Sequence, residues 1–383
     1  MTLTLKAYEP LISLGLYSRE FIDDITENHE GYNHSVTVIG GYESSSFTLR
    51  GDTNYLEDWY ENGLMRRIVF ENDEGITGWE GFVATIEFSK GTVKKVKSID
   101  NMYNRIYLRY SPADFSTYPP YISPSIDLIV DDSNSQIKYG IKSMTISGGE
   151  RVDDTAYNWA RTVLKDKKDV KEGAQDNILG SGDESLKITC KGYYHVLKWL
   201  PYISSVTTGY IKSHQVIQEI LEYFNSVNPG WMNLDFNFMK FNYRNEARAH
   251  RDLDSCWDVI GNIISEGGMG GERWVGGLYQ DRRFIYKPAE DFDSLYSLYS
   301  GYRRTISDTG QLIFDTNTGE EVKPWDVLPD RIIETTDFRL SGQKDQMYIE
   351  EVKFTEPNGL ELFGGEDQRL KVFLAQKGLP GVN

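Results

Sequence analysis

The sequence is poor in cysteine and histidine. Cys190 and Cys256 are the only cysteines among 383 residues, and the five histidines show no HExxH or similar spacing. Two cysteines supply neither a disulfide framework nor a CxxC metal site, so we expect folding in a reducing cytoplasm. Paired acids such as Asp131 and Asp132 lack the regular ligand spacing of a calcium loop, although calcium binding there stays open. We therefore assign no metal site and no cofactor.

The sequence also lacks long apolar runs and an excess of positive charge. No run approaches the roughly 20 residues that span a bilayer, and Met1–Lys6 lacks the regions of a signal peptide. We expect no membrane span and no export by that route. Lys+Arg of 41 against Asp+Glu of 58 gives a net charge of -17, which argues against a protein that grips nucleic acid through its phosphates. The acidity either keeps the protein soluble or lines a pore that DNA passes without binding.

Catalytic patterns are incomplete. His250-Arg251-Asp252 copies the opening of a kinase catalytic loop, but Trp257 stands where that loop needs a metal-binding Asn. The glycines within 267–271 follow an expected helix and do not lead from a strand into a helix N-terminus, as a phosphate-binding loop does. Glu350 and Glu351 are adjacent in an expected strand, so they point to opposite faces and cannot act as a glycosidase pair. We expect the chain not to be an enzyme.

Aromatic residues and glycine are abundant, with Tyr 25, Phe 17, Trp 8 and Gly 35. This composition favours aromatic-rich strands joined by tight turns. The segment from Gly40 to Ser89 predicts a strand, a short helix and a strand. Its strands show period-2 alternation, and its helix has helical spacing of Leu56, Trp59 and Tyr60 before Gly63.

Five segments together resemble the tail-tip and baseplate hub proteins of tailed phages, the late-control-D-like tail hub family. These segments are Gly41–Gly51, Leu56–Gly63, Trp79–Tyr110, Ile188–Trp199 and Pro324–Phe354. The resemblance implies an α+β, β-rich fold with two tail-tube-like β-barrel domains, short helices and smaller α/β and β segments. It also implies a homotrimer in which two related barrels per subunit form a six-fold ring.

The order of expected elements suggests four parts. They are a first tube-like β-barrel domain at 1–112, a second α/β tube-like unit at 113–200, a helical and hairpin segment at 201–300 and a β-rich segment at 301–383. The first boundary rests on the proline-rich stretch Ser111–Pro124, which resists regular structure. Gly81-Phe82 and Gly192-Tyr193 end two similar strand, helix, strand runs, which indicates either an internal duplication or a coincidence.

The resemblance implies a structural protein of the virion tail, assembled in the host cytoplasm. It would connect the tail tube to the host-contacting tip and line the DNA exit channel. Implied partners are further copies of the chain, a tail tube or distal tail protein, a tape-measure protein, and tip or fibre proteins, with DNA passing without specific binding. The alternative is a carbohydrate-binding module of the tip. We expect Trp59, Trp79 and Trp325 to serve assembly or partner contact, and Trp231, after Pro229-Gly230, to be an exposed ligand contact.

Overall fold

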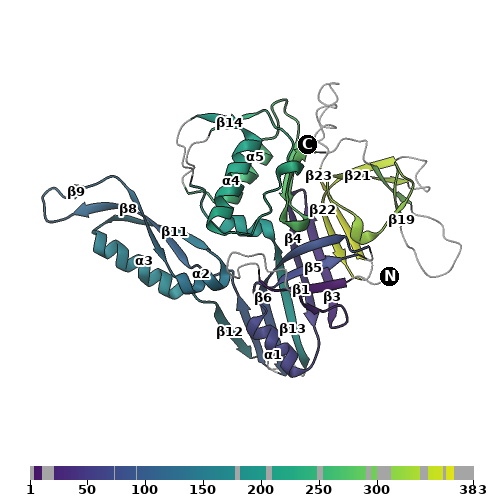
Figure 1. The fold of residues 1–383 in the computed structure, drawn as a ribbon, viewed down its shortest axis with the longest axis horizontal. Helices are drawn as coiled ribbons and strands as arrows, with labels where there is room; N and C mark the ends of the chain where they lie inside the picture. The colour runs from purple at the N-terminus through teal and green to yellow at the C-terminus, as the bar shows by residue number, and fades with distance from the viewer. Residues whose placement is uncertain are drawn as a thin grey trace, which may run out of the picture.

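The structure is a computed structural model of the 383-residue chain. It describes residues 4–10, 21–72, 74–91, 93–176, 182–203, 209–247, 253–289, 295–299, 312–336, 344–356 and 359–365. A 17-stranded sheet runs through the molecule, and a smaller sheet projects from it as an arm (Figure 1).

The central part of the large sheet is antiparallel. Its spatial order is β2 (Phe21–Asp24), β1 (Thr4–Tyr8), β5 (Arg67–Glu71), β6 (Thr77–Gly91), β13 (Gly182–Gly192), β4 (Ile39–Leu49) and β3 (His29–Thr37). The second half of β6 also pairs with β7 (Val93–Ser98), which in turn pairs with β12 (Lys171–Asp176). The sheet curves over a core in which the rings of Tyr32 and Phe70 stack with centroids 4.7 Å apart.

Helix α1 (Thr53–Asn62) confirms the helical spacing in the sequence. The carboxylate of Asp52 caps its start by accepting from the backbone N–H of Tyr55 at 2.9 Å, and Gly63 follows its last turn. Such a cap satisfies a donor that the helix itself leaves unpaired. The helix buries Leu56, Trp59 and Tyr60 against the core, so it covers one face of β6 and β13.

The arm consists of a small sheet covered by a helix. It contains β8 (Arg105–Asp114), β9 (Tyr121–Ile122), β10 (Ile126–Asp131), α2 (Ser133–Tyr139), β11 (Ser143–Arg151) and α3 (Asp153–Lys167). Strand β8 lies between β10, which is antiparallel to it, and β11, which is parallel. Ala156, Ala160 and Leu164 of α3 recur at helical spacing and bury against this sheet. The arm extends away from the body, with β9 at its outer end (Figure 1).

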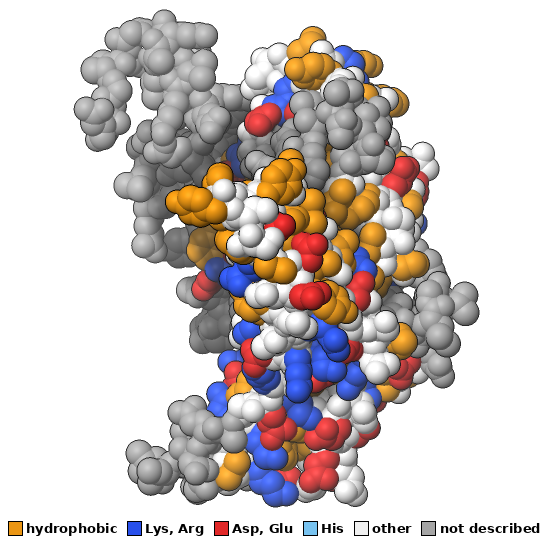
Figure 2. All heavy atoms as spheres, turned by 90° about the vertical axis from the view of Figure 1, so that its left-hand side faces the viewer, with side chains coloured by type: hydrophobic (Ala, Val, Ile, Leu, Met, Phe, Trp, Pro, Cys, Tyr) orange, Lys and Arg blue, Asp and Glu red, His pale blue; other side chains and the backbone are white. Residues whose placement is uncertain are grey.

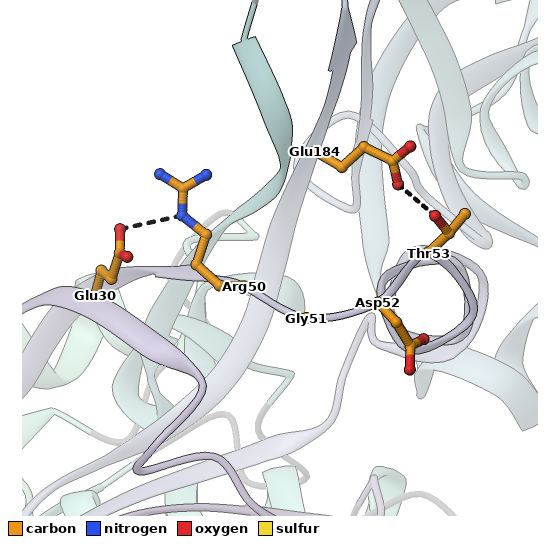
Figure 3. Close-up of a pocket in the computed structure, with 6 residues that line it drawn as sticks. All are labelled: Glu30, Arg50, Gly51, Asp52, Thr53 and Glu184. Atoms are coloured by element: carbon orange, nitrogen blue, oxygen red, sulfur yellow. Dashed lines mark hydrogen bonds and ion pairs between the residues drawn. The ribbon is translucent and has the colours of Figure 1, made fainter.

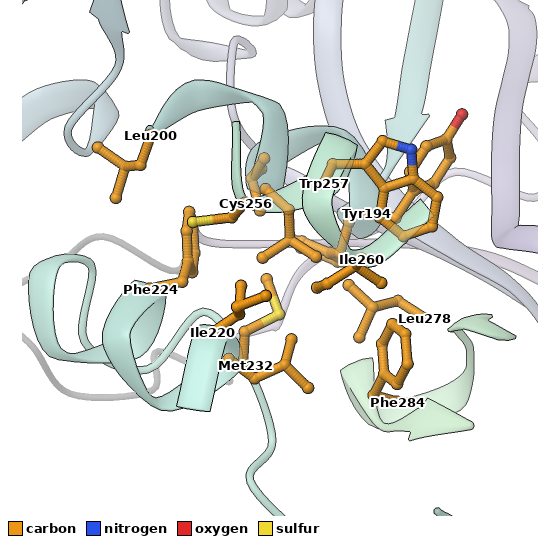
Figure 4. Close-up of a cluster of buried hydrophobic side chains, with 14 of the residues drawn as sticks. Tyr194, Leu200, Ile220, Phe224, Met232, Cys256, Trp257, Ile260, Leu278 and Phe284 are labelled. Carbon is orange, nitrogen blue, oxygen red and sulfur yellow. The ribbon is translucent and has the colours of Figure 1, made fainter. Parts of the chain in front are cut away.

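A helical part packs against β4 and β6 of the central sheet. It contains η2 (Tyr193–Trp199), β14 (Tyr210–Lys212), α4 (Ser213–Val227), η3 (Phe236–Phe238), β15 (Asn245–Ala247), α5 (Cys256–Ser265), β16 (Trp274–Leu278), η4 (Gln280–Arg282) and β17 (Phe284–Pro288). Side chains from α4, α5 and the β16–β17 hairpin converge in one apolar cluster (Figure 4). Strand β16 joins this part to the large sheet by pairing parallel to β4.

The C-terminal strands extend the large sheet beyond β3. They are β18 (Leu295–Tyr299), β19 (Leu312–Asp315), β20 (Glu321–Val322), β21 (Arg331–Thr336), β22 (Lys344–Thr355) and β23 (Gly359–Gly365), with η5 (Pro324–Asp326) between β20 and β21. Strand β22 pairs with β3, β21 and β23. Strands β22 and β23 pair antiparallel, and the sequence between them contains Asn358-Gly359, a pair that favours tight hairpin turns; Asn358 itself lies outside the described residues.

The fold is α+β and β-rich, as expected, but two barrels are not confirmed. Within the described ranges the strands form no closed barrel, because the central sheet ends at β2 on one side and continues through β3 into β22 on the other. Strand β13, placed in the second unit by the sequence, pairs with both β4 and β6 of the first. The four-part division at 112, 200 and 300 stays a prediction.

Candidate functional site

One face of the large sheet is lined with hydroxyl and charged side chains. Residues of β4, β6 and β13 alternate between an apolar side, which faces the core beneath α1, and a polar side that is half-buried or exposed. We call the second side the polar sheet face. It comprises Ser44, Ser46 and Thr48 of β4, Thr85, Glu87 and Ser89 of β6, Lys94, Val96 and Ser98 of β7, and Lys187, Thr189 and Lys191 of β13.

The strand register places these side chains in rows across the sheet. Thr189 lies between Ser46 and Thr85, and Thr85 lies beside Ser98. The hydroxyls of Thr85 and Ser98 are hydrogen-bonded at 2.7 Å. Lys187 lies between Thr48 and Glu87 in the neighbouring row. The face is therefore an array of hydroxyl groups interrupted by single charges.

Two of the three lysines on the polar sheet face, Lys94 and Lys191, have a carboxylate within ion-pair distance. The ammonium of Lys94 pairs with the carboxylate of Glu87, and Lys191 pairs with Asp100 at 2.6 Å. Such exposed pairs contribute little stability, about 0 to 1 kcal/mol. Their consequence here is electrostatic, because a lysine beside a carboxylate attracts phosphate less than a lysine alone. Figure 2, which views the molecule from the arm side, shows basic side chains gathered in the middle of its lower half with acidic side chains around them.

A pocket opens beside the start of α1 (Figure 3). It is lined by Glu30, Arg50, Gly51, Asp52, Thr53 and Glu184. Arg50 Nε donates to Glu30 at 3.1 Å, and Thr53 Oγ1 donates to Glu184 at 2.7 Å. Asp52 is used to cap α1. Among the described residues, no group of three or more His, Cys, Asp or Glu could hold a metal ion.

A buried ionic cluster joins the central sheet to the helical part. Glu80 of β6 is only 1% exposed. Arg67 Nε donates to its Oε1 at 2.8 Å, Arg282 Nε lies 3.8 Å from the same oxygen, and the backbone N–H of Asp281 donates to Oε2 at 3.0 Å. Burial of a carboxylate costs free energy unless charges and hydrogen bonds compensate it, and these three partners do so. The cluster is a structural clamp between β5–β6 and the β16–β17 hairpin.

The predicted tryptophan contacts all lie in the interior. Trp59, Trp79 and Trp325 are 1%, 0% and 8% exposed, and each packs in the core of the central sheet. Their predicted part in assembly stays a prediction, and their burial gives each a packing role. The expectation that Trp231 is exposed is wrong, since it is 2% exposed. The turn at Pro229-Gly230 directs its indole inward, where it packs edge-to-face against Trp199 at 5.4 Å.

The remaining sequence motifs show no assembled chemistry. In the glycine-rich turn, the backbone N–H of Gly270 donates to the carboxylate of Glu272 at 2.9 Å, so the chain's own anion occupies a donor that a phosphate would need. Glu350 pairs with Arg273 at 2.7 Å. Asp132 caps α2 and pairs with Lys168, whose hydrogen bond lowers the pKa of that carboxyl. The motif at 250–252 lies outside the described residues, and the expectation of no enzymatic activity stays a prediction.

Two surfaces were missed by the sequence reasoning. The polar sheet face was visible as the alternation of Ser44, Ser46 and Thr48, but only the register shows that β13 and β6 continue it. The second is an exposed aromatic group at the end of the arm, within the proline-rich segment on which the first predicted boundary rests. In the part of the chain that the structure describes, no helix is long and apolar enough to cross a membrane.

Comparison with known proteins gives only distant likenesses. No protein-family model matches the chain, and no curated protein matches it. The tail protein from Neisseria meningitidis MC58 has 9% identity and a TM-score of 0.43, covering 96% of this chain and 97% of that one. The prophage MuSo2 43 kDa tail protein from Shewanella oneidensis has 7% identity and a TM-score of 0.41, covering 95% and 96%.

A third solved structure is similar over the same extent. The prophage tail protein gp18 from Listeria monocytogenes EGD-e has 8% identity and a TM-score of 0.37, covering 98% of each chain. All three are tail proteins. Identities and TM-scores of this size do not establish a shared fold.

Proposed function

We propose that the chain is a structural component of a bacteriophage tail, located in the tail tip or baseplate hub. In that position it connects the tail tube to the host-contacting tip and lines the DNA exit channel. The family resemblance in the five sequence segments motivates this assignment. The observation that carries it is the polar sheet face, whose hydroxyls and paired charges suit a wall along which DNA moves.

A channel wall must avoid holding the DNA that passes. Unpaired Lys and Arg side chains bind phosphates and release counterions, which is the main source of non-specific DNA affinity. On the polar sheet face, Lys94 and Lys191 each have a carboxylate within ion-pair distance. The hydroxyls of Ser46, Thr85 and Thr189 can exchange hydrogen bonds with water as the DNA moves. In this proposal charge compensation replaces the acidic lining that the composition suggested.

Ring assembly also resolves an edge problem. Strands β2 and β12 each pair on one side only among the described strands, and an unpaired strand edge invites aggregation. Closure into a symmetric ring covers such edges. We propose a homotrimer that contacts a tail tube or distal tail protein, a tape-measure protein, and tip or fibre proteins. The protein is then part of the virion tail and is assembled in the host cytoplasm.

The carbohydrate-binding alternative loses its basis. It depended on an exposed indole, and Trp231 is buried. The proposed location is tested by labelling intact virions with an antibody to this chain and imaging them by negative stain. Label at the distal end of the tail is expected, and label confined to the capsid would overturn the proposal.

A further inference from the structure

The arm is fixed to the body by buried polar contacts. Asn104, which is 0% exposed, donates through Nδ2 to Gly140 O at 2.7 Å and accepts from the backbone N–H of Lys142 at 2.8 Å. The ammonium of Lys142 donates to Ile99 O at 2.6 Å and Asp100 O at 2.8 Å. Breaking these contacts would leave buried polar groups unpaired, so they hold the base of the arm in one arrangement.

Two further contacts tie the arm to the helical part. The backbone N–H of Ile141 donates to Oδ1 of Asn228, which ends α4, at 2.8 Å, and Asn228 Nδ2 donates back to Ile141 O at 3.1 Å. The hydroxyl of Ser143 donates to Trp199 O of η2. The direction of the arm is therefore set by the body, and its end is held away from the molecule's own surface (Figure 1).

The end of the arm exposes aromatic side chains with almost no charge. Tyr118 is 100% exposed, Tyr121 67% and Phe115 55%. Asp114 is the single charged residue in the stretch 114–126. Hydrogen bonds from the hydroxyl and backbone N–H of Ser116 lower the pKa of its carboxyl, so it carries a negative charge at neutral pH. Exposed aromatic groups of this kind are typical of interaction sites.

The body presents a second aromatic group with the opposite charge. In the stretch 236–243, Phe241 is 70% exposed, Tyr243 62% and Phe238 43%. Lys240 is the single charged residue in this stretch, and it is exposed. Its backbone N–H donates to Tyr286 O of β17 at 2.7 Å, which anchors the stretch to the helical part. The rigid backbone thus turns its aromatic side chains outward.

We propose that the end of the arm, residues 114–126, docks on residues 236–243 of a second copy of this chain. The two surfaces match in character, since both are aromatic, and in charge, since Asp114 of one copy meets Lys240 of the other. The surfaces differ from each other, so the contact is heterologous, and repetition of it closes a ring when the rotation between copies permits. The contact refines the ring proposed above and rests on it.

Cysteine cross-linking tests the contact in the full-length protein. The native Cys190 and Cys256 are buried, so engineered thiols can react selectively. Tyr118→Cys and Phe241→Cys chains are mixed and oxidised mildly, with Ile76→Cys, 49% exposed on the β5–β6 turn, replacing either partner as a control. We expect a disulfide between the two variants only in their mixture. Cross-linking within the Tyr118→Cys protein alone, equal cross-linking to Ile76→Cys, or no cross-link would overturn the contact.

A charge exchange tests the same pairing without new thiols. Asp114→Lys and Lys240→Asp each place like charges together, and we expect each to weaken self-association by about 3- to 10-fold in sedimentation equilibrium. The double variant restores the opposite charges and regains most of the association. Equal weakening in the single and double variants, or an unaffected association, would overturn the pairing. If one of these two contradicting outcomes is found while the antibody still labels the distal end of the tail, the proposed location stands and only this contact is wrong.

Discussion

Gly81 of β6 faces Gly192 of β13 across the antiparallel sheet. A Cβ added at Gly81 would lie 2.3 Å from Lys191 O, and one added at Gly192 would lie 1.6 Å from Tyr42 O. Both distances are far below van der Waals contact. The two glycines therefore let β4, β13 and β6 approach at the point where the central sheet passes into the helical part.

Replacing Gly192 should destabilise the protein strongly. In Gly192→Ala the new methyl group collides with backbone that side-chain rotation cannot move, and we expect a loss of at least about 1 to 3 kcal/mol. Gly173→Ala in β12 is the matched control, because a Cβ there meets nothing within 4 Å. Urea unfolding, followed by tryptophan fluorescence, measures the free energy of unfolding of both variants. Equal midpoints for the two variants would contradict the close approach.

The same glycines show what the sequence could and could not predict. Local signals were sufficient for α1, because the spacing of Leu56, Trp59 and Tyr60 predicts a helix that ends before Gly63, and the helix ends at Asn62. The pairing of Gly81 with Gly192 was beyond such reasoning, because it joins strands separated by the whole arm. The sequence leaves open whether the two Gly-aromatic runs are an internal duplication or a coincidence. The structure pairs their final glycines in one sheet.

Burial of aromatic residues was harder to predict than their place in an element. Trp59 lies within a helical pattern and Trp231 follows Pro229-Gly230, yet both are buried. The position of Trp231 depends on contacts with the rings of Trp199, Phe82 and Tyr193, which come from distant segments. A polar turn before a tryptophan therefore says little about which way the ring points. The polar sheet face was hard to predict for the same reason, because its rows depend on the register between strands that are distant in the sequence.

Removing the charge of Glu80 should break the buried clamp. Glu80→Gln leaves Arg67 and Arg282 facing each other without their shared carboxylate, and breaking a buried ion pair in this way costs about 3 to 5 kcal/mol. Glu61→Gln is the control, since Glu61 is 65% exposed in its pair with Lys97 and should contribute at most about 1 kcal/mol. Differential scanning calorimetry compares the two. If Glu61→Gln lost as much stability as Glu80→Gln, burial of the ion pair would not explain the loss.

Acid should weaken the fold through His34. Burial lowers the pKa of His34 to about 3, and within the described chain its Nδ1 has no hydrogen-bond partner. In the unfolded chain it binds a proton below about 6.5, so stability is full above that pH and is lost as the pH falls towards 3, by up to about 1.4 kcal/mol per pH unit.

A His34→Phe variant isolates this contribution, because Phe suits the surrounding rings of Tyr32, Phe70 and Phe354 and cannot be protonated. The free energy of unfolding is measured for both proteins between pH 4 and pH 7.5. We expect the free energy of unfolding of the variant to rise steadily relative to that of the natural protein as the pH falls below about 6.5. Parallel pH profiles would mean that His34 is not held neutral in the fold.

Charge compensation on the polar sheet face should decide whether DNA adheres. Glu87→Lys removes the partner of Lys94 and adds a second positive charge beside it. We expect this variant to bind double-stranded DNA at low salt where the natural protein does not, with a salt slope of about 1 to 2 because one or two phosphates are contacted. Glu320→Lys makes the same charge change in an exposed turn away from this face. Filter binding at several salt concentrations compares the three proteins. If Glu320→Lys bound DNA as strongly as Glu87→Lys, net charge would account for the effect, and the paired charges of the polar sheet face would have no special part in letting DNA pass.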